Sequence, residues 1–179
     1  MTVWTIGHGT RPIDELIRLL RVHGVRCLID VRTIPRSRHN PQFNRDRIAD
    51  DLAAAGIAYV HMPGLGGLRR PRPDSSNTGW RNSGFRGYAD YMETEPFAVN
   101  LESLIRRARA EPTAIMCAET VPWRCHRSLI SDALTARGVD VNHIMSETVA
   151  DRHRMPPWAH VEGSHVSYPG ATAPKASGA

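Results

Sequence analysis

The stretch AIMCAETVPWRCHR occupies residues 114–127 and decides the expected fold. It begins as a short apolar run, which is typical of a buried strand, and it ends in a dense set of reactive side chains. Apolar residues then recur between Leu129 and Leu134 with the spacing of a helix that buries one face. The stretch therefore predicts a strand, a tight polar connection and a helix in direct succession.

This order assigns positions to the reactive side chains. Cys117 and Glu119 are expected at the carboxyl end of the strand, and the tripeptide Cys-His-Arg of residues 125–127 in the first turn of the helix. A helix start offers free N–H groups and the positive end of the helix dipole. It can therefore hold an anion or lower the pKa of a thiol.

Three helix–glycine–strand joints extend the alternation along the chain. They are His23-Gly24-Val25, Ala55-Gly56-Ile57 and Arg137-Gly138-Val139, in which glycine can adopt the left-handed conformation that ends a helix. We therefore predict a three-layer α/β fold, in which helices cover both faces of an open, mostly parallel sheet of about five strands. The predicted strands span residues 3–6, 25–31, 58–62, 113–117 and 139–144.

The same pattern predicts how the chain is divided. A single α/β domain is expected over residues 1–145. Within it, residues 63–84 are rich in Gly, Pro and Arg and have no periodicity, which predicts a long functional or mobile loop. Residues 146–179 contain several prolines and many small residues, so we expect a C-terminal tail that is partly disordered at its end.

Arginine dominates the basic side chains. The net charge is +5, and 22 of the 23 basic residues are arginine because Lys175 is the only lysine. Residues 26–47 hold six arginines and two aspartates, and residues 69–86 hold five arginines and one aspartate, so each segment has a net charge of +4. Clustered arginine suits recognition of phosphate or carboxylate groups, and a merely solvated basic surface is the alternative.

Neither a membrane protein nor a disulfide-stabilised protein is expected. No apolar run approaches the roughly 20 residues of a membrane span. The three cysteines, Cys27, Cys117 and Cys125, form an odd count without the spacing of a disulfide framework. We therefore expect a cytoplasmic protein with reduced thiols and no membrane partner.

The predicted parallel sheet places a site. Parallel strands point their carboxyl ends to one edge, where ligands bind in open α/β sheets. Taken singly, the histidines could be core residues and Cys117 a small buried hydrophobe, but convergence at one edge favours a functional site. The residues expected at this edge are His8, Asp30, Arg32, His61, Cys117, Glu119 and His143.

Six short motifs also occur in a recognisable order between residues 2 and 144. They are Thr5-Ile6-Gly7-His8, Asp30-Val31-Arg32, Pro35-Arg36-Ser37-Arg38, Leu65-Gly66-Gly67, Cys117-Ala118-Glu119 and Cys125-His126-Arg127. In kind and order they resemble the motifs of the domain-of-unknown-function 488 family. The resemblance implies an α/β fold and no settled activity.

Three chemistries compete for the site. In the first, Cys125 beside His126 and flanking arginines is a stabilised thiolate for covalent catalysis, and should be alkylated faster than Cys27. In the second, Cys117, Cys125 and His126 bind a metal, with His8 or His61 as a candidate further ligand. Their spacing is not that of a structural zinc site, and adjacent residues on a helix point in different directions. In the third, arginine loops bind nucleic-acid phosphates and exposed aromatic residues stack on bases.

The favoured interpretation is an enzyme, a hydrolase or transferase with a thiol or acid/base mechanism, whose anionic substrate is a nucleotide or nucleic acid. It assigns no metal ligand. The alternative is a non-catalytic nucleic-acid-binding or regulatory module with structural cysteines, or the metal site. The predicted catalytic residues are Cys117, Glu119, Cys125 and His126. The predicted substrate-binding residues are His8, Asp30, Arg32, Ser37, Arg38, Arg124 and Arg127. The arginines expected to bind polyanions are Arg36, Arg38, Arg69, Arg70 and Arg72.

Overall fold

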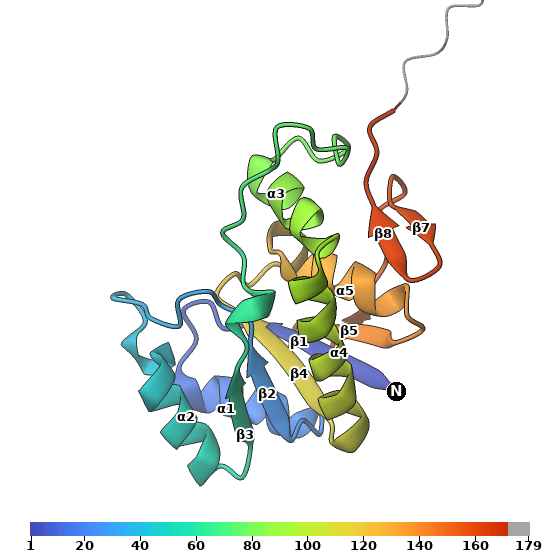
Figure 1. The fold of residues 1–179 in the computed structure, drawn as a ribbon. Helices are drawn as coiled ribbons and strands as arrows, with labels where there is room; N and C mark the ends of the chain where they lie inside the picture. Colours follow the sequence, from blue (N-terminus) through green and yellow to red (C-terminus); the bar gives the residue numbers. More distant parts are fainter. Residues whose placement is uncertain (172–179) are drawn as a thin grey trace, which may run out of the picture.

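A computed structural model of the chain describes residues 1–171. Its centre is a six-stranded sheet in the order β3-β2-β4-β1-β5-β6, in which β1 to β5 are parallel and β6 runs antiparallel to β5. Helices lie on both faces of this sheet (Figure 1), so the predicted three-layer α/β fold with a mostly parallel sheet is confirmed. The strands are β1 (Thr2–Gly7), β2 (Cys27–Asp30), β3 (Ala58–His61), β4 (Thr113–Cys117), β5 (Asp140–Ile144) and β6 (Ala150–Arg152), with a separate hairpin of β7 (His160–Glu162) and β8 (His165–Ser167).

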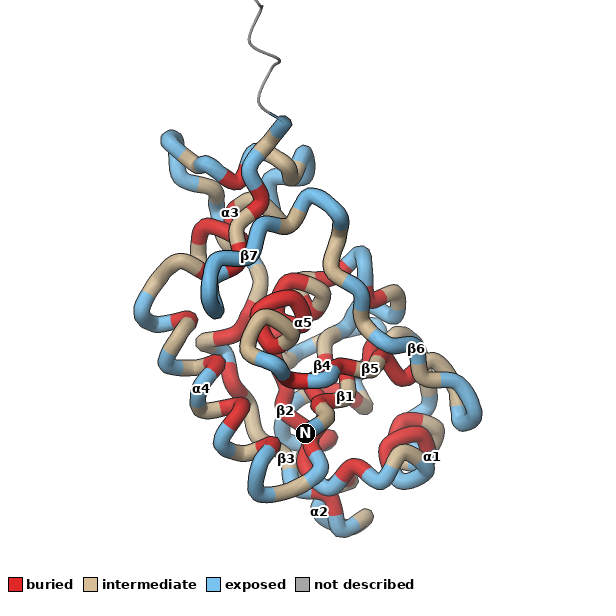
Figure 2. Tube along the Cα trace, turned by 90° about the vertical axis from the view of Figure 1, so that its right-hand side faces the viewer, coloured by how far each residue is buried: buried red, intermediate tan, exposed pale blue. Residues whose placement is uncertain are grey.

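Two hydrophobic clusters fill the space between the sheet and its helices. Successive strand residues point to opposite faces, so Leu28 belongs to the cluster with α1 (Ile13–Val22) and α2 (Arg45–Ala54), and Ile29 to the cluster with α4 (Glu95–Ala110) and α5 (Arg127–Thr135). Figure 2 shows the resulting burial of the central strands and of α5. Among residues 1–171, none of the helices combines the length and the apolar composition of a membrane-spanning segment. The helices are α1 (Ile13–Val22), α2 (Arg45–Ala54), α3 (Ser83–Met92), α4 (Glu95–Ala110) and α5 (Arg127–Thr135), with the 3-10 turns η1 (Pro41–Phe43), η2 (Pro63–Leu65) and η3 (Pro122–Arg124).

All three helix–glycine–strand joints form as predicted. The φ angles of Gly24, Gly56 and Gly138 are 71°, 75° and 73°. The residue after each glycine donates its backbone N–H to the carbonyl five residues earlier, inside the preceding helix. This Schellman arrangement satisfies the last carbonyls through local hydrogen bonds. The joints are therefore predictable from short stretches of sequence.

The predicted irregular loop is present over residues 66–82, between η2 and α3. It is held by the buried carboxylate of Asp90 in α3. This carboxylate accepts hydrogen bonds from the Arg72 backbone N–H (2.8 Å), the Ser75 hydroxyl (2.6 Å) and the Asn77 side-chain amide (2.8 Å). The loop is thus fastened to α3 by charge-assisted hydrogen bonds.

Residues 146–171, which the sequence assigns to a C-terminal tail, pack against the α/β domain. β6 extends the main sheet, and Tyr168 beyond β8 is fully buried. The Tyr168 hydroxyl donates to Asp132 of α5 at 2.6 Å, and its backbone N–H donates to Asn77 Oδ1 at 2.9 Å. The β5–β6 pairing and the buried Tyr168 side chain together attach this segment to the domain, and its prolines and small residues gave no sign of either in the sequence. The predicted disorder at the end of the chain falls on residues 172–179, which lie outside the described residues.

Candidate functional site

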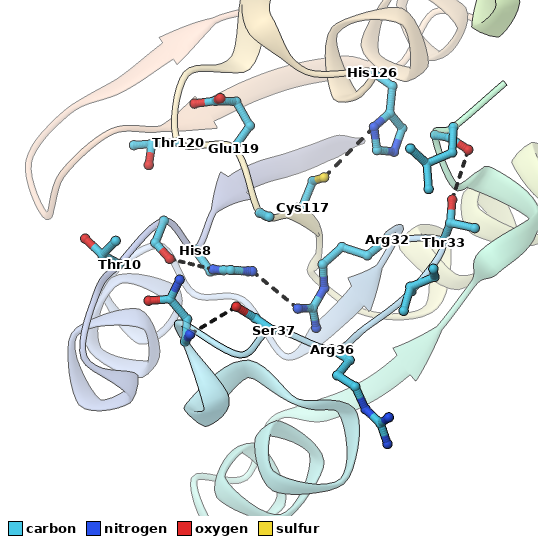
Figure 3. A pocket seen from close by; sticks show the side chains of 16 residues that line it. His8, Thr10, Arg32, Thr33, Arg36, Ser37, Cys117, Glu119, Thr120 and His126 are labelled. Atoms are coloured by element: carbon cyan, nitrogen blue, oxygen red, sulfur yellow. Dashed lines mark hydrogen bonds between the residues drawn. The ribbon is translucent and has the colours of Figure 1, made fainter. Parts of the chain in front are cut away.

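A cavity of about 640 Å³ lies where β1, β2 and β4 reach their carboxyl ends (Figure 3). Its volume is in the range of small-ligand sites. The residues that line it come from the ends of these three strands, from the loops that follow them and from the loop after η2. The predicted site residues that line it are His8, Arg32, Ser37, Cys117, Glu119 and His126.

Two thiols and one imidazole meet in this cavity wall. His126 Nδ1 lies 3.9 Å from Cys117 Sγ and 3.7 Å from Cys125 Sγ. His126 Nε2 donates to the Val31 carbonyl at 3.0 Å, so Nδ1 presents a lone pair to the sulfur atoms when the ring is neutral and an N–H when the ring is protonated. Sequence reasoning found the three side chains, but it missed the Val31 carbonyl that orients the ring.

Cys125 precedes the helix, which corrects the prediction that it lies in the first turn. The η3 turn ends at Arg124, Cys125 has an extended backbone (φ −128°, ψ 146°), and His126 is the N-cap of α5. Pro122 starts the η3 turn, and the Cys125 N–H closes it by donating to the Pro122 carbonyl. Because the backbone changes from extended to helical between Cys125 and His126, the two adjacent side chains converge.

The two thiols have opposite pKa shifts. The neighbouring thiol of Cys117 holds the pKa of Cys125 well below its usual value, assisted by His126 and Arg127 and opposed by burial. The same pairing with Cys125, together with burial, raises the pKa of Cys117. The backbone N–H of Arg127 also donates to Cys125 Sγ at 3.5 Å. Of the two thiols, the buried Cys125 is therefore the more acidic and the cavity-lining Cys117 the less acidic.

A buried ion pair supports the opposite wall. Arg32 donates to both carboxylate oxygens of Asp30, from Nε at 2.9 Å and from Nη2 at 2.6 Å, and Nη2 also donates to the Phe43 carbonyl. Arg32 Nη1 donates to His8 Nε2 at 3.3 Å, and His8 Nδ1 donates to the Gly9 carbonyl at 2.8 Å. The Arg32 guanidinium is thus bonded to groups of the protein itself, and its contact with Nε2 holds His8 in one neutral tautomer.

The family model described as "Domain of unknown function DUF488" matches residues 12–134, which is more than half of the chain. The chain belongs to the DUF488 family. The resemblance based on the motifs is thereby confirmed, although the first motif precedes the matched residues. No curated protein and no solved structure matches the chain.

In this DUF488 chain the Arg127 side chain lies inside the fold and does not line the cavity. Arg127 is fully buried, and it donates to the Thr5 hydroxyl at 2.9 Å and to the Glu119 carbonyl at 2.5 Å. It therefore ties β1 to the loop after β4. Asp30, also predicted to bind substrate, is fully buried and reaches the cavity only through Arg32.

Glu119 lines the cavity without joining the thiol cluster. Its side chain is exposed, and Oε1 accepts the Val121 N–H at 3.1 Å. Figure 3 shows Glu119 and Thr120 on one side of the view and His126 on the other. Glu119 is therefore placed to contact a bound ligand, whereas His126 is placed to act with the thiols.

The predicted polyanion-binding arginines of the DUF488 chain differ in whether their guanidinium groups already contact another side chain of the protein. The Arg69 guanidinium lies 3.5 Å from the centre of the Tyr91 ring, and Arg72 pairs with Glu93 at 2.6 Å. Among the remaining three, only one lines the cavity, namely Arg36. The exposed arginines of the two predicted sets are Arg36, Arg38, Arg70, Arg72 and Arg124.

Two buried histidines make the stability of the DUF488 chain dependent on pH. Burial lowers the pKa of His8 from 6.5 to about 4, and burial together with His153 lowers the pKa of His143 from 6.5 to about 3. Between pH 6.5 and pH 4 the unfolded chain binds protons that the folded chain does not bind. The stability contributed by the neutral rings is therefore complete above pH 6.5 and is lost as the pH falls.

We expect His8 alone to account for a loss of about 3 kcal/mol between pH 7 and pH 4, because 1.36 kcal/mol corresponds to each pKa unit. Urea unfolding of the wild type and of His8→Gln at several pH values measures this loss. The wild type should lose about 3 kcal/mol more than the variant over that interval. Parallel pH profiles for the two proteins would contradict the prediction.

Proposed function

We propose that this DUF488 chain is an enzyme, a hydrolase or transferase, that acts on an anionic substrate of nucleotide size in the cavity. The observation that carries the proposal is the meeting of Cys117, Cys125 and His126 in the wall of a cavity of about 640 Å³. An imidazole of fixed tautomer beside two thiols with opposite pKa shifts is the kind of perturbed cluster that concentrates at functional sites.

The rest of the lining supports an anionic, hydroxyl-bearing substrate. Arg36 is exposed, lines the cavity and has no ion-pair partner among residues 1–171, so its guanidinium can donate two parallel hydrogen bonds to a phosphate or carboxylate. Thr10, Ser37, Asn40 and Thr120 add hydroxyl and amide groups that suit a sugar phosphate. The anionic group is thus expected near Arg36, and the reacting group near Cys117.

A panel of nucleotides, sugar phosphates and short oligonucleotides tests the proposal, with turnover followed by phosphorus NMR and mass spectrometry. We expect turnover of at least one member. Cys117→Ser and His126→Asn should each lower kcat by about 100-fold or more. Cys27→Ala changes a buried strand thiol outside the cavity and should leave kcat unchanged. Absence of turnover across the panel, or full activity of both site variants, would contradict the proposal.

Two neighbouring arginines give a matched control for the anion contact. Arg36 and Arg38 are both exposed, but only Arg36 lines the cavity. Arg36→Gln should raise KM about tenfold or more through loss of its charge-assisted contact with the anionic group, whereas Arg38→Gln should leave KM unchanged. Equal effects of the two substitutions would remove Arg36 from the proposed contact.

A further inference from the structure

We propose that Cys117, Cys125 and His126 bind a divalent transition metal of the zinc class, with the fourth coordination position open to the cavity. The ligand atoms of these three residues all lie within 4.8 Å of one another. Thiolate and imidazole are the ligands that zinc prefers, and two cysteines with one histidine form a known catalytic ligand set.

The distances fit tetrahedral coordination. With Zn–S near 2.3 Å and Zn–N near 2.0 Å, the sulfur and nitrogen ligands of a tetrahedral ion are separated by roughly 3.6 Å. The observed separations of His126 Nδ1 from the two sulfurs are 3.9 Å and 3.7 Å. An ion can therefore be placed among the three atoms with only small side-chain movements.

The surrounding groups hold two of the ligands, His126 and Cys125, in the state that a metal requires, and Cys117 would release its proton to the solvent on binding. The Val31 carbonyl accepts the Nε2 proton of His126, which leaves Nδ1 free to coordinate. The Arg127 N–H donates to Cys125 Sγ, a contact that stabilises the charge of a thiolate. A Cβ at Gly67 would lie 3.1 Å from His126 Nδ1, so the glycine allows the ring to pack closely in this position. These contacts are the outer shell that orients metal ligands.

The arrangement leaves one coordination position on the cavity side. Cys117 and His126 line the cavity, whereas Cys125 is buried behind them. Within residues 1–171, no fourth His, Cys, Asp or Glu belongs to this group. A site with three protein ligands and an open position is typical of catalytic zinc, where the metal acts as a Lewis acid and activates a bound water. That catalytic role rests on the proposed function, but metal binding itself does not.

Cobalt and zinc titrations of the reduced, full-length protein test the proposal without any substrate. We expect one equivalent of Co²⁺ to bind, with a sulfur-to-metal charge-transfer band and the intense visible bands of tetrahedral cobalt, and Zn²⁺ to displace it. Cys117→Ser, Cys125→Ser and His126→Asn should each weaken binding at least about 100-fold. Cys27→Ala and His153→Gln, which change a cysteine and a histidine outside the cluster, should bind as the wild type does.

Alkylation with iodoacetamide gives a second readout. In the zinc-loaded protein Cys117 should label slowly, and a chelator should accelerate labelling at least tenfold, while Cys27 stays unreactive in both states. Absence of the charge-transfer band, with Cys117 labelling equally fast with and without chelator, would overturn the metal site and leave a thiol enzyme. Metal binding without turnover of any panel member would instead uphold the site and reject the proposed function. Circular dichroism of each variant confirms that the fold is retained.

Discussion

Replacing Asp30 by Asn is expected to lower the free energy of unfolding by about 3–5 kcal/mol, because it leaves the Arg32 charge buried without its partner. Asp30 is fully buried and Arg32 is 6% exposed, so solvent cannot replace the lost interaction. For a chain of this length the change corresponds to a fall in Tm of roughly 6–20 °C. Urea unfolding and thermal unfolding measure the two quantities.

A control on the same carboxylate separates the buried charge from an ordinary hydrogen bond. The Tyr59 hydroxyl donates to Asp30 Oδ2 at 2.6 Å, so Tyr59→Phe removes one hydrogen bond and keeps the ion pair. It should cost only about 1 kcal/mol. The double variant Asp30→Leu/Arg32→Met removes both charges and should recover part of the loss. If Asp30→Asn costs no more than Tyr59→Phe, the ion pair does not support the cavity wall as we describe.

Replacing Gly7 by Ala is expected to cost about 3 kcal/mol and to displace the loop that carries Glu119. A Cβ at Gly7 would collide with the Glu119 carbonyl oxygen and would lie 2.6 Å from the Thr120 Cα. These are backbone atoms, so no side-chain rotation can relieve the collision. The close approach arises because the loop after β4 crosses the end of β1, where the His8 and Gly9 N–H groups donate to the Cys117 and Ala118 carbonyls.

Gly138→Ala is the matched control for this substitution. Gly138 has a φ of 73° and an open environment, in which a Cβ meets nothing within 4 Å. Its replacement should cost only about 1–2 kcal/mol, the penalty of the left-handed conformation. Gly7→Ala should also weaken Co²⁺ binding, because it shifts the strand end that carries Cys117, whereas Gly138→Ala should not. Equal stability losses for the two variants would contradict the steric explanation.

Much of the fold could be predicted because its signals are local. The helices end at Gly24, Gly56 and Gly138 through hydrogen bonds that span five residues. Each joint can therefore be recognised from a short stretch of sequence. The buried parallel strands β2 and β4 are apolar runs, which the sequence displays directly. The attachment of residues 146–171 was not predicted, because it depends on the pairing of β6 with β5 and on the buried Tyr168, and neither shows as a periodic pattern in the sequence.

The sequence likewise predicted one part of the candidate site, the placement of its residues, but not the other, their bonding partners. Parallel strands must bring their ends to one edge, so the sequence was sufficient to place His8, Arg32 and Cys117 around one cavity. It was not sufficient to assign their partners. Helical periodicity suggested that Cys125 and His126 diverge, whereas the extended backbone at Cys125 brings both side chains to Cys117.

The sequence by itself determined the order of strands and helices, their glycine ends and the set of reactive side chains at the strand ends. The tertiary structure alone decided which of those side chains line the cavity and which are bonded within the fold. The Arg127 guanidinium donates a hydrogen bond to the Thr5 hydroxyl, 122 residues away, and His126 is oriented by the Val31 carbonyl, 95 residues away. Such contacts depend on β4 lying between β1 and β2. A polar group takes its partner from whatever the packed chain brings near it, and no local pattern records that choice.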